Sequence, residues 1–104
     1  MNHLPRNHLQ LEAAVVERES VRYTPAGVPI VSCTLHHRAE VVEAGVSRQV
    51  EMTLQALVAG ELAGALERCE LGVNAHFAGF LALRSRNART LVFHITEIQH
   101  IGKD

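Results

Sequence analysis

Apolar and polar residues alternate along five stretches of the chain, and this period of two is typical of β-strands with one buried face. The clearest stretch is residues 47–58, where every second residue from Val50 to Val58 is apolar and Glu51 lies between two of them. The stretches that we predict as strands are residues 8–24, 29–38, 47–58, 72–84 and 90–101. The pattern therefore predicts an all-β protein.

Two of the predicted strands contain interruptions of the alternation. The doublets Ala13-Ala14 and Val15-Val16 are typical of a β-bulge or a strong bend, because a bulge adds one residue to a strand. Gly79 lies in the middle of the fourth strand, where a glycine commonly marks a bulge or the tight curvature of a small barrel.

The hydrophobic period changes between the third and fourth strands. In residues 60–72, Leu62, Leu66 and Cys69 recur at helical spacing, which predicts a helix of two to three turns that ends near Gly72. Three strands, a helix and two strands are the element order of an OB-fold, a five-stranded Greek-key barrel. We expect residues 1–7 to form a loose leader and residues 8–104 to form the OB-fold domain.

The adjacent histidines His36 and His37 are the first candidate for a metal or catalytic site. Neighbouring side chains on a strand point to opposite faces, so these two imidazoles cannot easily bind one ion. Zinc needs three or four ligands, and the other histidines form no HxxxH or CxxC pattern. We therefore predict no metal site, with His36 on the surface and His37 partly buried.

The sequence gives no sign of an enzyme, a cofactor or a membrane segment. It contains no GxSxG motif, no glycine-rich phosphate loop and no paired carboxylates in an apolar setting. No apolar run approaches the ~20 residues that a bilayer span requires. Cys33 and Cys69 lie in apolar patterns and fit reduced, buried thiols. We predict a cytoplasmic protein that is not an enzyme and needs no cofactor.

Arginine supplies nine of the ten cationic residues, although the net charge is −1. Oligonucleotides bind OB-folds on the face of the second and third strands and on the loops that join strands one to two and four to five. Several arginines map to this surface, and arginine binds phosphates and stacks on bases. Scattered solubilising charge is the alternative. The predicted nucleic-acid-binding residues are Arg22, Tyr23, His36, Arg38, Arg48, Arg84, Arg86 and Arg89.

Few residues on this surface can stack on bases, and several acidic residues lie near it. Tyr23 and Phe80 are the aromatic residues that remain once Phe77 and Phe93 are assigned to the core. The acidic loop that we expect at residues 40–43, together with Glu51, would repel phosphates. Binding should therefore be mainly electrostatic and should weaken steeply with salt.

Four segments together resemble the primosomal members of the bacterial single-stranded-DNA-binding protein family: YTPAGVPIVSCTLHHR, EAGVSRQVEM, HFAGFLALRSR and LVFHITEIQHI. The similarity runs from about His8 to Ile101. It implies that the basic DNA-contacting positions of the family fall on Arg22, Arg38 and the arginines of residues 84–89. It also implies that Glu51 replaces an aromatic residue on the third strand and that Val46 replaces another in the preceding loop.

The same resemblance implies a biological setting. It implies a homodimer that binds single-stranded DNA and helps to restart stalled replication forks with the PriA helicase and, in some bacteria, the DnaT loading factor. The alternative is an adaptor module that mainly binds the helicase and binds DNA only weakly.

Overall fold

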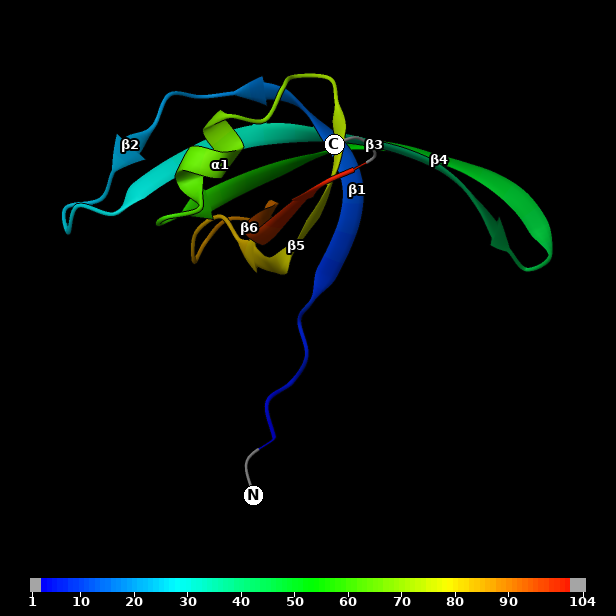
Figure 1. The fold of residues 1–104 in the computed structure, drawn as a ribbon. Helices are drawn as coiled ribbons and strands as arrows, with labels where there is room; N and C mark the ends of the chain where they lie inside the picture. Colours follow the sequence, from blue (N-terminus) through cyan, green and yellow to red (C-terminus); the bar gives the residue numbers. More distant parts are fainter. Residues whose placement is uncertain (1–2, 102–104) are drawn as a thin grey trace.

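Five long strands close into a barrel in the computed structural model, which describes residues 3–101 (Figure 1). Within that range the elements are β1 (Leu9–Arg18), β2 (Arg22–Tyr23), β3 (Pro29–Glu43), β4 (Val46–Ala59), α1 (Ala63–Glu67), β5 (Asn74–Leu83) and β6 (Leu91–His100). The strand order is β1-β5-β6-β4-β3, β1 also pairs with β3 and so closes the barrel, and the short β2 extends the edge of β3. The predicted OB-fold, with its helix between the third and fourth long strands, is confirmed.

The expected leader, residues 1–7, and domain, residues 8–104, both reach beyond the described range, because residues 1–2 and 102–104 lie outside it. Residues 3–8 precede β1 without regular secondary structure. Within residues 3–101, no helix has the length and apolar character needed to cross a membrane.

Strand β1 joins the two halves of the barrel, and it bulges where the sequence doublets predicted. Its first part, Leu9–Ala14, pairs with β5, and its second part, Ala14–Arg18, pairs with β3. The register with β3 shifts between Val15 and Glu17. The extra residue lets one strand turn from one neighbour to the other, as β-bulges do in closed barrels.

Gly79 lies at a second bulge, which was also expected from the sequence. The β5–β6 register shifts between Ala78 and Gly79. A Cβ atom at Gly79 would lie 1.9 Å from the carbonyl oxygen of His94 on β6. Glycine is therefore required here because the two backbones approach too closely for any side chain.

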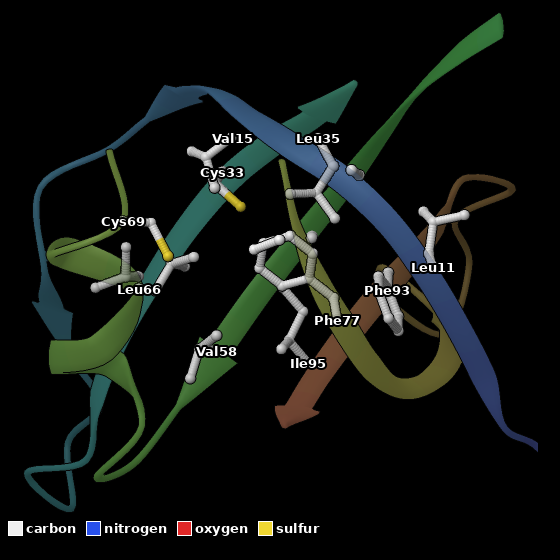
Figure 2. Close-up of a cluster of buried hydrophobic side chains, with 14 of the residues drawn as sticks. Leu11, Val15, Cys33, Leu35, Val58, Leu66, Cys69, Phe77, Phe93 and Ile95 are labelled. Atoms are coloured by element: carbon white, nitrogen blue, oxygen red, sulfur yellow. The ribbon is translucent and has the colours of Figure 1, made fainter. Parts of the chain in front are cut away.

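The inward residues of the alternating pattern fill the barrel, and α1 covers one end of it (Figure 2). Leu35, Phe77 and Phe93 are fully buried, and Leu66 from α1 belongs to the same buried cluster. Burial raises the pKa of the Cys33 thiol to about 12. A thiol that stays protonated is a poor nucleophile, so Cys33 acts as a small core residue.

The helix is shorter than predicted, with five residues instead of two to three turns. The amide of Arg68 donates to both Gly64 and Ala65, and the amide of Cys69 donates to Leu66, three residues back. This tightening ends the α-helix one turn early. Leu66 and Cys69 nevertheless remain buried, as their spacing indicated.

Strands β3 and β4 extend beyond the barrel as a two-stranded arm, defined here as residues 38–51 (Figure 1). The prediction of an acidic loop at residues 40–43 is wrong, because these residues pair with β4 up to Glu43 and Val46. Ala44 and Gly45 form the whole turn, with φ angles of 54° and 79°. Two left-handed residues form the tight hairpin turn that matches the twist of paired strands.

Candidate nucleic-acid interface

The register of β3 and β4 divides their side chains between the core and an outward face. Residues directly opposite each other share a face. The pairs Leu35–Leu54 and Arg38–Glu51 lie on opposite faces, because Leu35 and Arg38 are an odd number of positions apart along β3. His36 therefore shares the outward face with Arg38. His37 points the other way, where its Nδ1 lies 2.7 Å from the carbonyl oxygen of Glu12. The two imidazoles are separated as the strand geometry predicted.

The adjacent histidines thus do not form a joint site. Among residues 3–101, the structure contains no group of three or more His, Cys, Asp or Glu side chains that could hold a metal ion. The polar chemistry of the outward face lies instead in its arginines and in the side chains that contact them.

Strand β2 carries Arg22 and Tyr23 to the edge of this face. Arg22 pairs with Ile30 of β3, and its Nη1 donates a hydrogen bond of 2.9 Å to Oγ of Ser32. The same Nη1 lies 3.8 Å from a carboxylate oxygen of Glu19, with both side chains mostly exposed. Tyr23 is 67% exposed. Arg22 is thus placed over the outward face, with part of its charge offset by Glu19.

The loop between β5 and β6 brings further arginines to the same region. The amide of Arg84 donates to the carbonyl of Thr90 and closes the hairpin, so the predicted loop at residues 84–89 is confirmed. Arg84, Arg86 and Arg89 are exposed. Arg84 and Arg22 line one groove, although they are 62 positions apart in the sequence. The groove is lined by Glu19, Arg22, Ser32, Gln55, Ala56, Leu57, Ala82, Leu83, Arg84, Val92 and His94.

Arg48 does not lie on this face, although the sequence placed it there. It pairs with Val41 across the arm, three positions from the Arg38–Glu51 pair, and therefore lies on the opposite face. Its Nη1 donates a hydrogen bond of 2.9 Å to Glu43, and the two side chains form an exposed ion pair. A role for Arg48 in nucleic-acid binding remains a prediction, from the other side of the arm.

Glu51 adds negative charge to the outward face. One of its carboxylate oxygens lies 2.8 Å from Nε2 of His36. The hydrogen bond from His36, and then the charge of Arg38, lower the pKa of the Glu51 carboxyl below its usual 4.5. Glu51 is therefore ionised at neutral pH, and it offsets the positive charge of Arg38, its direct cross-strand partner.

Sequence reasoning missed an aromatic pair on the same face. Phe80 of β5 and His94 of β6 are directly opposite each other, and their rings stack with centroids 4.8 Å apart and planes 10° from parallel. Phe80 was recognised only as an available aromatic, and His94 and Gln55 were not singled out. The alternation of inward and outward residues along β6 could have indicated that His94 points outward, because it lies between the buried residues Phe93 and Ile95.

The closed barrel, its helix and the outward groove define an OB-fold protein. Residues 7–97 match the sequence model described as "Another single-strand binding protein family". The Replication restart protein PriB of Bordetella pertussis is 39% identical over 96 residues, covering 92% of this chain and 90% of the relative. The PriB of Nitrosomonas europaea is 32% identical over 96 residues, covering 92% and 89%. The chain belongs to this single-strand binding protein family and, within it, to the replication restart PriB proteins.

Solved structures agree with this assignment. The PriB structure from Ralstonia solanacearum superposes with a TM-score of 0.84 at 48% identity, covering 92% of this chain and 98% of the other. The single-strand binding domain from a Synechococcus protein superposes with a TM-score of 0.69 at 22% identity, covering 95% of this chain and 100% of the other, which shows a shared fold.

Proposed function

We propose that this protein binds single-stranded DNA during the restart of replication and links the strand to a restart helicase. The observation that carries the proposal is the convergence of Arg22 and Arg84, from distant parts of the chain, on one outward groove. The family to which the chain belongs and the names of its relatives support the same role. The PriA helicase is the proposed partner, with DnaT as a second one.

Arginine–phosphate contacts would supply most of the affinity. Within residues 3–101, the arginines of the 84–89 loop form no ion pair within 4.0 Å, whereas Glu19 lies near Arg22 and Glu51 lies opposite Arg38. The loop arginines thus keep their full charge for phosphates. Each phosphate neutralised on a single strand releases counterions and contributes about 0.7 to the slope of log affinity against log salt.

Replacing Arg84→Ala together with Arg86→Ala should weaken binding of a dT oligonucleotide and reduce the salt slope by roughly 1.4. The reason is the loss of two phosphate contacts. Fluorescence anisotropy across a salt series measures both quantities. Arg68→Ala, which removes an exposed positive charge at the end of α1, should leave the slope unchanged. Absence of binding at low salt, or binding by wild type that does not respond to salt, would refute the proposal.

An adaptor that binds mainly the helicase is the second candidate. The carboxylates of Glu19 and Glu51 on the outward face favour it. The double arginine variant separates the two functions when helicase stimulation is assayed at salt concentrations where DNA binding is negligible. Loss of stimulation under those conditions favours the adaptor. Loss only where DNA is bound favours the DNA-binding function.

We propose that the protein is a homodimer in which a second copy covers the inner face of the arm. This face continues the inward faces of β3 and β4 beyond the end of the barrel, where no core covers it. Its apolar residues Val41, Val46 and Met52 are therefore 41%, 64% and 39% exposed. Exposed apolar residues on a two-stranded edge are typical of an association surface, and the Arg48–Glu43 ion pair lies among them on the same face.

The arm provides a matched pair of variants to test the dimer. Met52→Glu should convert a species of twice the chain mass into a monomer, because it places a charge in the apolar interface. Thr53→Glu, on the outward face of the same strand, should leave the dimer intact. Analytical ultracentrifugation measures the mass. A wild-type chain that sediments as a monomer at micromolar concentration would rule out the homodimer.

A further inference from the structure

Four side chains form a row across four strands on the outward face. Ser32 of β3 pairs with Leu57 of β4, Leu57 pairs with His94 of β6, and His94 pairs with Phe80 of β5. Adjacent strands lie about 4.8 Å apart, so the row crosses the groove in order. The half-buried Leu57 forms an apolar floor between Ser32 on one side and the His94 ring on the other.

The His94 ring presents a flat wall to this floor. One face of the His94 ring stacks on the ring of Phe80, its cross-strand neighbour, and this contact holds the His94 ring upright. His94 lines the groove and Phe80 does not, so Phe80 packs against the face of the His94 ring that is turned away from the groove. The groove encloses about 350 Å³, within the range of about 300–1,000 Å³ for small-ligand sites. An aromatic wall above an apolar floor suits a flat, unsaturated ring.

The opposite side of the groove offers hydrogen-bonding groups. Oγ of Ser32 accepts a hydrogen bond from Arg22, which leaves the Ser32 hydroxyl hydrogen available to donate. Nε2 of Gln55 donates to Oγ1 of Thr34 at 3.2 Å, which leaves the Gln55 carbonyl oxygen available to accept. A donor and an acceptor beside an aromatic wall match the edge and the face of a nucleobase.

We propose that this groove holds one unstacked nucleobase of the bound strand. The base stacks on His94, lies on Leu57 and presents its edge to Ser32 and Gln55. Arg22 and Arg84, which also line the groove, contact the phosphates that flank it. Glu19 lies in the same groove beside Arg22 and disfavours a phosphate at the centre. This inference rests on the proposed single-stranded DNA function and adds a base-contacting subsite to it.

The test compares a dT oligonucleotide with an abasic oligonucleotide of the same length and charge. Wild-type protein should bind the dT oligonucleotide roughly fivefold to a hundredfold more tightly, as one stacked base would provide. His94→Ala should remove most of this preference while leaving the salt slope unchanged. His94→Phe should restore it, because a phenyl ring also stacks, and this variant separates loss of stacking from loss of folding.

His76→Ala is the matched control, since His76 is an exposed histidine of β5 outside this groove and its removal should leave the preference for bases unchanged. Equal affinity of wild type for the abasic and dT oligonucleotides would overturn the base subsite and leave the phosphate-binding function standing. Failure of wild type to bind either oligonucleotide at low salt would overturn the proposed function, and the subsite with it.

Discussion

Replacing Gly79 by alanine should destabilise the protein by about 3 kcal/mol or more, the upper end of the cost of overpacking. The new Cβ would lie 1.9 Å from the carbonyl oxygen of His94 and 2.9 Å from its carbonyl carbon. Both are backbone atoms of the paired strand, so neither can rotate away. Relief requires β5 and β6 to separate at the bulge, which opens the barrel beside Phe77 and Ile95.

Thermal unfolding followed by circular dichroism measures this effect. For a chain of this size, about 3 kcal/mol corresponds to a fall in Tm of more than about 12 °C. Gly64→Ala is the matched control, because its Cβ would meet only the flexible end of the Arg68 side chain, at 3.3 Å. Alanine also favours helix over glycine by ~1 kcal/mol. If the Gly79→Ala protein has the same Tm as the wild-type protein, the bulge accommodates the added Cβ without loss of stability and the prediction is wrong.

The hydrophobic alternation predicted the barrel because most of each strand lies over the core. It gave the inward residues of β3, β4, β5 and β6, and both bulges followed from local signals at Val15-Val16 and Gly79. The outer part of the arm, residues 39–46 between the two predicted strands, was missed because no core lies beneath it. Its acidic and apolar residues therefore read equally well as a loop, and only the turn at Ala44-Gly45 decides that the pairing continues.

The candidate site shows the same limit. The outward positions of His36 and Arg38 follow from strand parity within β3. The face of Arg48 also follows from parity within β4, because Arg48 alternates in phase with Met52 and the buried Ala56, and the sequence-based assignment overlooked this. The pairing of Phe80 with His94 depends on the β5–β6 register after a bulge. Sequence patterns within single strands carry no information about that register.

Replacing Glu51 by tryptophan should strengthen single-stranded DNA binding by roughly tenfold or more, through one added stacking contact. Glu51 is exposed on the outward face, where its carboxylate accepts a hydrogen bond from His36 and lies opposite Arg38. The substitution removes a charge that repels phosphates, releases Arg38 to contact them, and supplies an indole at the position where the resemblance implies an aromatic residue. The chain has no other tryptophan, so quenching of the introduced fluorescence reports binding directly.

Two further variants separate charge from stacking. Glu51→Gln removes the carboxylate alone, so its gain should shrink as salt rises, because exposed charges are screened. The additional gain from the indole should persist at high salt, because stacking releases no counterions. Glu61→Trp, an exposed position before α1, controls for a tryptophan elsewhere on the surface. Equal affinity of Glu51→Trp and wild type at every salt concentration would mean that the strand does not pass over Arg38, and the DNA path would then be restricted to the groove between Arg22 and Arg84.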